Sequence, residues 1–463
     1  MTKNKVLFII PDGVGIRNYL YSDLLHQLKE AEITFLSPLP KKAFQELKVD
    51  FTYFHLTFSK ESFLTRIARE TATFARLCYN AEKVKNPSIL ENWNYEPKGI
   101  KLKFLNKTAQ LFGKVASKKY TYILKLENFA QKHWSNQVIE QYKKQLLQIN
   151  PKAVFVTHQR VASLMPICIA AKQLNIPVIA AIYSWDNLPK GRLAIIADKY
   201  VVWSDYMRDE MQLFYPEIPL ENIIVTGTPQ FEFYLQQDKI IERESFAKQH
   251  GLDVNRPWIC FSGDDIKTSP YDPQYLNDLA QAVVEIEERN RPQIIFRRSP
   301  VDFSIRYDEV INQFRDSIKP IDPLWNVPEA NGNWGTFFPK KEDIILQFNL
   351  GYHCELVVNL GSTMAHDFAI FNKPCCYFNY DPVQNENWSV KTIYNFQHFR
   401  SMEGLEAVGW FNSKTDIKNK IETLLSEKTT MGKDRKLWLE KIVLHPVNEA
   451  SANIAKLLKG YNG

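Results

Sequence analysis

The sequence lacks several patterns that would place it in a class at once. Its longest apolar runs, such as residues 178–183, are far shorter than the roughly 20 residues of a membrane-spanning helix. The first residues lack the charged, apolar and small-residue order of a secretory signal. The six cysteines include no C-x-x-C pair, which favours reduced, buried thiols over zinc ligands or a disulfide framework. We therefore expect a soluble, cytoplasmic protein.

The composition is that of an ordinary globular protein. Hydrophobic residues make up 45% and charged residues 24% of the 463 positions, which excludes a disordered or collagen-like chain. The formal net charge of +6 is too small over this length to indicate nucleic-acid binding. Evidence for a charged partner must therefore come from local clusters of charged residues.

Short apolar runs alternate with helical patterns, which is typical of βαβ units and parallel sheets. The first series of strand-like runs spans residues 6–11, 32–36, 51–56, 153–157, 177–184 and 200–204. The second series spans residues 222–227, 258–263, 293–299, 355–360 and 374–380. A single sheet of about eleven strands would exceed the usual size. The pattern predicts an α/β protein with two doubly wound domains.

Two prolines, Pro216 and Pro219, indicate a break between the two series. We predict a first Rossmann-like domain over residues 1–210, with a basic helical insertion at about 97–149, and a second over residues 220–415. The hinge is expected near residues 206–222. Residues 416–463 show helical spacing and are expected to cross back to the first domain.

The clearest ligand-binding pattern is V-V-N-L-G-S-T-M-A-H-D-F at residues 357–368. A strand ends before Gly361, which turns the chain. Ser362 and Thr363 then stand where a helix begins, and free N–H groups and hydroxyls at a helix start suit a phosphate. Asp367 suits paired ribose hydroxyls, because a carboxylate accepts two hydrogen bonds. A well-capped structural helix with a surface aspartate is the alternative.

Two other strand ends of the second series carry charged residues. Arg297 and Arg298 follow one strand, where open α/β sheets place their ligands, and guanidinium groups match phosphate oxygens. Because side chains alternate along a strand, only one of the two is expected to face a cleft. Gly263 and Asp264 follow another strand. An ordinary charged strand end is the alternative, but three converging strand ends favour one nucleotide site.

In the first series, candidate acid–base groups follow the strands. Asp12 lies in the loop P-D-G-V-G-I-R-N, which lacks the third glycine of a dinucleotide fingerprint and suits an acceptor pocket as well as a phosphate. His158 and Asp186 follow two later strands. A hydrogen-bonded loop histidine is the alternative for His158, and turn chemistry is the alternative for Asp186.

These segments resemble glycosyltransferases of the GT-B fold. The resemblance lies in A-D-K-Y-V-V-W-S at residues 197–204, N-I-I-V-T-G-T-P-Q-F at 222–231, and L-G-S-T-M-A-H-D at 360–367 followed by K-P at 373–374. The segment R-R-S-P at 297–300 is similar to the R-x-H-P of transferases for capsular polysaccharide, Kdo and glycerol phosphate, with Ser299 in the place of histidine. The resemblance covers most of residues 1–400 as architecture and is specific only over these segments.

The resemblance implies two Rossmann-like domains that face a cleft, with a nucleotide-sugar donor on the second domain and an acceptor on the first. The donor is then a substrate, so no cofactor is expected. No bound metal is expected either, and the sequence has no D-x-D at a strand end. The implied reaction moves a sugar to a hydroxyl of a glycan or lipid-linked acceptor in surface-polysaccharide synthesis.

The stereochemical course decides whether a base is needed. An inverting transfer needs a general base in the first domain, for which Asp12 is the first choice and His158 and Asp186 are the alternates. A retaining transfer needs none. Two other classes share the two-lobed plan: a nonhydrolysing sugar-nucleotide epimerase, which needs several acid–base groups in the cleft, and a non-enzymatic binding module.

Residues 98–132 contain nine lysines and a single acidic residue. The lysines are interleaved with apolar residues and include Lys101, Lys103, Lys107, Lys114, Lys118 and Lys119. A basic amphipathic helix is typical of an element that lies on an anionic membrane, whereas a solvated helix face is the alternative. We expect peripheral attachment to the inner face of a membrane, and no nucleic-acid partner, because no nucleic-acid-binding module accompanies the charge.

Overall fold

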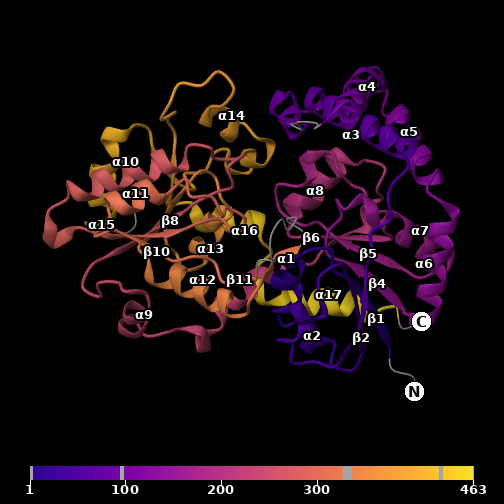
Figure 1. Ribbon diagram of the computed structural model, residues 1–463, viewed down its shortest axis with the longest axis horizontal. Coiled ribbons are helices and arrows are strands. Elements are labelled where there is room, and N and C mark those ends of the chain that lie inside the picture. Colours follow the sequence, from indigo (N-terminus) through magenta and orange to yellow (C-terminus); the bar gives the residue numbers. More distant parts are fainter. Residues whose placement is uncertain (1–3, 94–98, 327–335, 427–430, 462–463) are drawn as a thin grey trace.

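In the computed structural model the chain forms two parallel sheets, one in each half of the molecule (Figure 1). The structure describes residues 4–93, 99–326, 336–426 and 431–461. The strand order is β3-β2-β1-β4-β5-β6-β7 in the first sheet and β10-β9-β8-β13-β14-β15 in the second. Helices cover both faces of each sheet, so the predicted α/β fold of two Rossmann-like, doubly wound domains is confirmed.

The strands of the first sheet are β1 (Lys5–Ile9), β2 (Glu32–Ser37), β3 (Phe51–His55), β4 (Ala153–Val156), β5 (Val178–Ala181), β6 (Lys199–Val202) and β7 (Ile223–Val225). Those of the second are β8 (Trp258–Ser262), β9 (Gln293–Arg297), β10 (Ile318–Pro320), β13 (Leu356–Asn359), β14 (Cys375–Phe378) and β15 (Gly409–Phe411). A short antiparallel ribbon joins β11 (Trp325–Asn326) to β12 (Phe338–Pro339).

The helices of the first half are α1 (Gly13–Gly15), α2 (Leu24–Gln27), α3 (Phe63–Lys83), α4 (Ile100–Ala116), α5 (Tyr120–Lys132), α6 (Asn136–Ile149), α7 (Met165–Gln173) and α8 (Asp205–Phe214). Those of the second half are α9 (Arg243–His250), α10 (Asp272–Val284), α11 (Asp308–Gln313), α12 (Glu342–His353), α13 (Met364–Ile370), α14 (Val390–Tyr394), α15 (Ile417–Ser426), α16 (Arg435–Ile442) and α17 (Ala450–Lys459).

The first sheet separates two apolar cores. Successive side chains of a strand point to opposite faces, so Leu7 and Ile9 of β1 enter one core while Phe8 enters the other. Because both faces are covered, the central strands β4 and β5 are apolar throughout rather than alternating with polar residues. The second core also takes Ile454 and Leu458 of α17, so the last helix packs on the first domain.

The change from the first sheet to the second lies later in the chain than the sequence predicts. Residues 222–227 were expected to open the second series, but β7 pairs in parallel with β6, at the edge of the first sheet. The β6–α8–β7 segment is a complete βαβ unit, in which α8 returns the chain to the same sheet. Pro216 and Pro219 therefore lie in the α8–β7 connection rather than at a hinge between domains.

Two elements that bear on later sections complete the description. In the described part of the chain, no helix is both long and apolar enough to cross a membrane. The helices α3, α4 and α5, with the short 3-10 segment η3 (Pro87–Trp93), form a separate layer at the edge of the first domain, which lies at the top right of Figure 1.

Candidate functional site

A cleft lies between the two domains and has two adjacent compartments that share part of their lining. The arginine compartment, of about 280 Å³, lies between α1 with the turn that follows it and the ends of β8, β9 and β13. The tryptophan compartment, of about 350 Å³, lies between the segment after β5 and the residues that follow α14. Four residues border both compartments, namely Ser184, Asp264, Ser362 and Thr363.

The structure gathers most of the sequence-predicted residues at this cleft. Those that border the arginine compartment are Gly263, Asp264, Arg297, Arg298, Ser362, Thr363 and Asp367. Gly361 and Asp186 border the tryptophan compartment. Asp12 and His158 border neither; they lie behind Tyr183, whose ring stacks on that of His158 and forms part of the wall.

Arg297 ends β9 and is held by a buried ion pair. Its Nη2 atom donates to both carboxylate oxygens of Asp343, at 2.8 and 3.0 Å, and only 5% of the residue is exposed. Burial alone would raise the pKa of Asp343, but the guanidinium lowers it below its usual value. The Nη1 atom of Arg297 is buried and has no hydrogen-bond partner among the described residues. One donor therefore remains available to a ligand.

Arg298 also borders the arginine compartment, so the expectation that only one arginine reaches the cleft is wrong. The strand ends at Arg297, and the alternation of side chains ends with it. The Nε atom of Arg298 donates to the exposed Asp322 at 2.8 Å, and Nη1 donates to the carbonyl of Ser304. Both arginines are thus oriented by acceptors of their own domain.

The loop from Asn359 to α13 contributes hydroxyl groups but few free amides. The side chain of Asn359 accepts from the N–H of Ser362 at 2.8 Å, and the Ser362 hydroxyl accepts from Met364 at 3.4 Å. The Thr363 N–H has no partner among the described residues. Local bonds therefore use part of the helix start that the sequence assigns to a phosphate.

Asp367 is buried under the same loop and is engaged on both oxygens. Oδ1 accepts from the Tyr234 hydroxyl at 2.7 Å, and Oδ2 accepts from Gln347 at 3.3 Å. Burial raises the pKa of Asp367, while the nearby Arg17 guanidinium opposes that rise. Each carboxylate oxygen has two lone pairs, so Asp367 keeps acceptor capacity toward the compartment that it borders.

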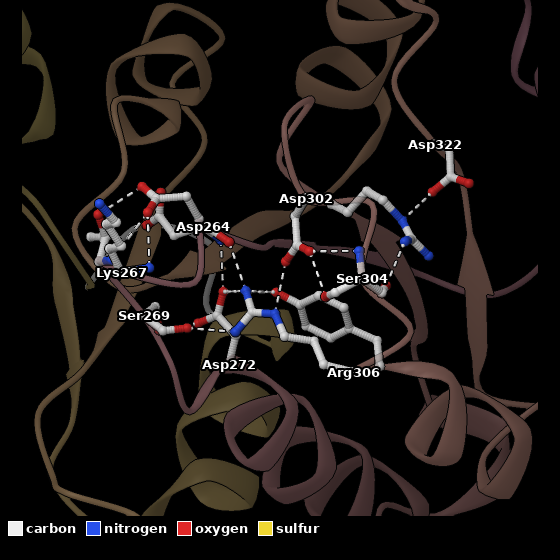
Figure 2. Close-up of polar contacts among 12 residues, drawn as sticks. Asp264, Lys267, Ser269, Asp272, Asp302, Ser304, Arg306 and Asp322 are labelled. Carbon is white, nitrogen blue, oxygen red and sulfur yellow. Dashed lines mark hydrogen bonds and ion pairs between the residues drawn. The ribbon is translucent and has the colours of Figure 1, made fainter. Parts of the chain in front are cut away.

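Asp264 is positioned by the network drawn in Figure 2. Arg306 lies at its centre and donates to Asp302 at 2.7 Å and to the carbonyl of Asp264 at 2.8 Å. Asp272 accepts from the N–H of Asp264 at 2.6 Å. These bonds fix the backbone of the loop after β8, whereas the Asp264 carboxyl itself makes no hydrogen bond in the described part of the chain.

Two carboxyls of this network, those of Asp264 and Asp272, are shifted toward their neutral forms. Burial raises the pKa of Asp264 well above its usual value, and the neighbouring carboxylates of Asp272 and Asp265 raise it further. Burial also raises the pKa of Asp272 to about 6. A raised pKa favours the protonated carboxyl, which is the form that donates a proton, and Asp264 borders both compartments.

Asp12 and His158 form a pair in the first domain. Oδ2 of Asp12 lies 2.7 Å from Nδ1 of His158, and Oδ1 accepts from the N–H of Gly15 at 3.1 Å. Both oxygens of Asp12 are therefore occupied. A carboxylate beside Nδ1 holds the proton there and leaves Nε2 as the basic atom of neutral His158. That Nε2 is buried and has no hydrogen-bond partner among the described residues.

Asp186 is tied up in an ion pair. Lys190, one turn further along, donates to its Oδ2, and Asn187 donates to its Oδ1 at 2.8 Å. Burial alone would raise the pKa of Asp186, but the Lys190 ammonium lowers it well below its usual value. Asp186 is therefore a poor proton acceptor, and the pair contributes one carboxylate and one ammonium group to the wall of the tryptophan compartment.

Contacts across the cleft tie the two domains together. Nη2 of Arg17 donates to Oε1 of Gln347 at 2.8 Å, which joins the π-helical segment after α1 (Ile16–Leu20) to α12. The indole N–H of Trp185 donates to the Thr363 hydroxyl at 3.3 Å, at the boundary between the two compartments. Among the described residues, no group of three or more His, Cys, Asp or Glu side chains is placed to hold a metal ion.

Comparison with known proteins identifies the fold of this chain but does not assign the chain to a family. No protein-family model and no curated protein match the sequence. Solved structures do match over the whole chain. A UDP-GlcNAc 2-epimerase from Methanocaldococcus jannaschii aligns with a TM-score of 0.54 at 13% identity, over 98% of this chain and 99% of that chain. The chain has a GT-B-like fold.

Two other matching structures are enzymes that differ from each other in the reaction they catalyse. A glycosyltransferase from Rickettsia africae aligns with a TM-score of 0.53 at 10% identity, over 100% of this chain and 99% of that chain. A UDP-GlcNAc 2-epimerase from Neisseria meningitidis bound to UDP-GlcNAc aligns with a TM-score of 0.50 at 11% identity, over 98% and 100%. At these identities the likeness is one of fold, and the reaction must be argued from the site.

Several cleft residues were not foreseen from the sequence. Arg17 lies in the predicted glycine loop, but nothing in that loop marks it as a contact to the other domain. Gln347 and Asp343 lie on α12, which was not predicted because its apolar residues are not confined to one face. Tyr183 and Trp185 follow β5 and carry no motif.

Proposed function

We propose that the protein is an enzyme that binds a nucleotide-activated sugar in the cleft between its domains. The observation that supports this most is the buried Arg297 in the wall of the arginine compartment, whose Nη1 atom has no hydrogen-bond partner among the described residues. A buried donor without a partner costs about 1–3 kcal/mol, which an anionic ligand would relieve. Arg298 and the Ser362 and Thr363 hydroxyls border the same space, and together these groups suit a diphosphate.

The rest of the nucleotide is assigned to the same wall. Asp367 borders the compartment and has acceptor capacity left for ribose hydroxyls. The Arg17–Gln347 bond lies against it, so a bound nucleotide would meet both domains. Ligands of open α/β sheets bind at the carboxyl ends of the strands, and all three strand ends of this wall belong to the second sheet.

His158 is the proposed base, with Asp12 as its positioning residue. Each Asp12 oxygen already makes one hydrogen bond, and the contact to Nδ1 leaves Nε2 as the atom of His158 that has no hydrogen-bond partner among the described residues. In a sugar transfer, the acceptor hydroxyl would give its proton to Nε2 as its oxygen bonds to the anomeric carbon, and the nucleoside diphosphate would leave. Because Nε2 is covered in this structure, the step requires Tyr183 or the β1–α1 loop to shift.

Two reactions fit this arrangement, each with its own support. Epimerisation removes a proton from one face of a sugar carbon and returns one to the other, so it needs two proton-transfer groups. His158 on the first domain and Asp264 on the second, whose pKa is raised by burial, are candidates for such a pair, and several of the structural neighbours are UDP-GlcNAc 2-epimerases. These neighbours lend this reaction more support than they lend transfer.

Glycosyl transfer is supported by the tryptophan compartment. It has about 350 Å³ and adjoins the arginine compartment at Ser362 and Thr363, which border both, so a second substrate has room beside the first. Epimerisation needs no second substrate. In this version the compartment takes a glycan or lipid-linked acceptor, as expected of an enzyme of surface-polysaccharide synthesis, and Asp186 and Lys190 contact its hydroxyls.

A thermal-shift panel followed by an acceptor-free incubation tests the proposal. UDP, GDP, CDP, CMP and dTDP are each added to the full chain, and one is expected to raise the melting temperature, since a ligand at 100 times its Kd stabilises by about 2.7 kcal/mol. The matching nucleotide sugar is then incubated alone. A new epimer indicates epimerisation, and turnover only with a glycan acceptor indicates transfer. Absence of any nucleotide effect would overturn the assignment.

A further inference from the structure

The outward face of α4 is an apolar stripe exposed to solvent. Ile100 is 87% exposed, Phe104 61%, Leu111 67% and Val115 59%. At 3.6 residues per turn these four positions fall on one side of the helix. Isolated exposed apolar residues are common, but a continuous stripe on a single helix marks an interaction surface. We call these four residues the α4 stripe.

The opposite face of α4 packs tightly against the protein. This packing holds the helix in one orientation, with the α4 stripe toward solvent. Leu105 and Ala109 are buried. A Cβ atom at Gly113 would lie 2.9 Å from the Phe74 ring and 3.0 Å from the carbonyl of Thr71, both on α3. This close approach fixes the rotation of α4 about its own axis. Figure 1 shows α4 on the outside of the helical layer, away from the first sheet.

Lysines flank the stripe and no carboxylate does. Residues 99–126 contain no aspartate or glutamate. Helical spacing places Lys103, Lys107 and Lys114 along one side of the stripe, and all three are exposed. Beyond the end of α4, the ammonium groups of Lys119 and Lys125 lie 5.9 and 5.8 Å from the centre of the Tyr122 ring.

We propose that the α4 stripe docks on an anionic lipid bilayer. An apolar stripe bordered by lysines matches the boundary between acyl chains and negatively charged headgroups. A second copy of this chain matches it less well, because pairing two α4 faces would bring their lysines together without a carboxylate between them. The proposal does not depend on the reaction that the cleft catalyses.

The bilayer would lie beside the tryptophan compartment. The Trp93 indole N–H donates to Asn106 of α4 at 3.4 Å, so η3 and α4 are in contact. Asn92, the neighbour of Trp93, borders that compartment. Docking through the α4 stripe therefore holds one mouth of the cleft near the lipid surface, where a lipid-borne substrate would be presented.

Vesicle flotation of the full chain tests the docking. The vesicles are pure phosphatidylcholine, or phosphatidylcholine with phosphatidylglycerol, at low and raised salt. One variant neutralises the flank of the stripe (Lys103→Gln, Lys107→Gln and Lys114→Gln). Its control removes the same charge from exposed lysines elsewhere (Lys248→Gln, Lys456→Gln and Lys459→Gln). Each triple variant changes the net charge from +6 to +3.

We expect flotation with the anionic vesicles only, weakened by salt. The flank variant should lose about 100-fold in partitioning, from roughly fivefold per lysine, and the control should lose far less. Leu111→Ser should weaken binding at both salt concentrations. Equal loss in the two triple variants, or no flotation by the native chain, would overturn the proposal. So would a native dimer that Leu111→Ser dissociates, because a second copy would then cover the stripe.

Discussion

The Nδ1 atom of His158 lies 2.7 Å from Oδ2 of Asp12, although the two residues are 146 positions apart in the sequence. Neighbouring parallel strands explain the contact, because β1 and β4 pair directly and their carboxyl ends lie side by side. The Tyr183 ring stacks on the imidazole at 3.9 Å between ring centres and holds its plane. The first domain thus presents one oriented imidazole rather than a free carboxylate.

The first prediction concerns this pair. His158→Gln removes the proposed base and should lower kcat by about 10²–10⁴-fold. Asp12→Asn should also lower kcat, because an amide that donates to Nδ1 moves the imidazole proton to Nε2. Steady-state kinetics with the nucleotide sugar found in the thermal-shift panel would show the loss. If both variants keep the native kcat, another group is the base or the reaction needs none.

The second prediction concerns Arg298. Arg298→Ala should weaken nucleoside diphosphate binding at least tenfold, since a charge-assisted contact to phosphate is lost. Arg289→Ala is the matched control, because Arg289 is exposed and also paired with an exposed carboxylate, that of Glu287. Isothermal titration calorimetry measures both affinities. Equal affinities for the two variants would remove Arg298 from the site.

The third prediction concerns the turn at Gly361. Its φ is +85°, and a Cβ atom there would lie 2.7 Å from the Phe399 ring. Gly361→Ala should therefore lower the free energy of unfolding by about 1–3 kcal/mol from the strained φ, and by more from the clash. Gly404→Ala isolates the first cost, because Gly404 has a φ of +79° with nothing within 4 Å of its Cβ position. Denaturant unfolding that shows equal losses would disprove the clash.

The fourth prediction is a pH dependence of stability. Burial raises the pKa of Glu210 from 4.5 to about 8. Between these values the native state keeps a proton that the unfolded chain loses, so this contribution to stability is full below about pH 4.5 and is lost as the pH rises to about 8.

Glu210→Gln removes that dependence. The difference in the free energy of unfolding between Glu210→Gln and the native chain should grow by a few kcal/mol in favour of Glu210→Gln as the pH rises from 5 to 8. The exposed Glu244→Gln serves as the control and should gain nothing. Urea unfolding at several pH values measures the difference. A constant difference between Glu210→Gln and the native chain would show that Glu210 titrates normally.

The arrangement of the sheets followed from local pattern, because buried parallel strands are short apolar runs. The incorrect assignment of β7 to the second sheet shows what the local pattern cannot predict. The apolar residues Ile223–Val225 indicate a strand, but they do not indicate which sheet the strand joins. The prolines before them favoured a domain boundary at this point. The strands β10 and β15 have only three residues each and gave no separate signal.

The sequence predicted which strand ends carry site residues, but it did not predict the contacts among those residues. Asp264, Arg297 and Ser362 lie at the ends of β8, β9 and β13, and they border one compartment, as three strand ends of one sheet should. The partners that decide their roles lie far away in sequence. The Asp343 that neutralises Arg297, the Gln347 that links Arg17 to Asp367, and the Asp12 that orients His158 are all tertiary contacts.

The most direct test of the central claim is amide hydrogen exchange of the full chain with and without the nucleoside diphosphate that stabilises it most. Binding in the arginine compartment predicts slower exchange at residues 262–264, 297–300 and 360–367, the ends of β8, β9 and β13, with a smaller effect at residues 12–18. Protection confined to other segments, with these strand ends unchanged, would contradict a nucleotide site in this cleft.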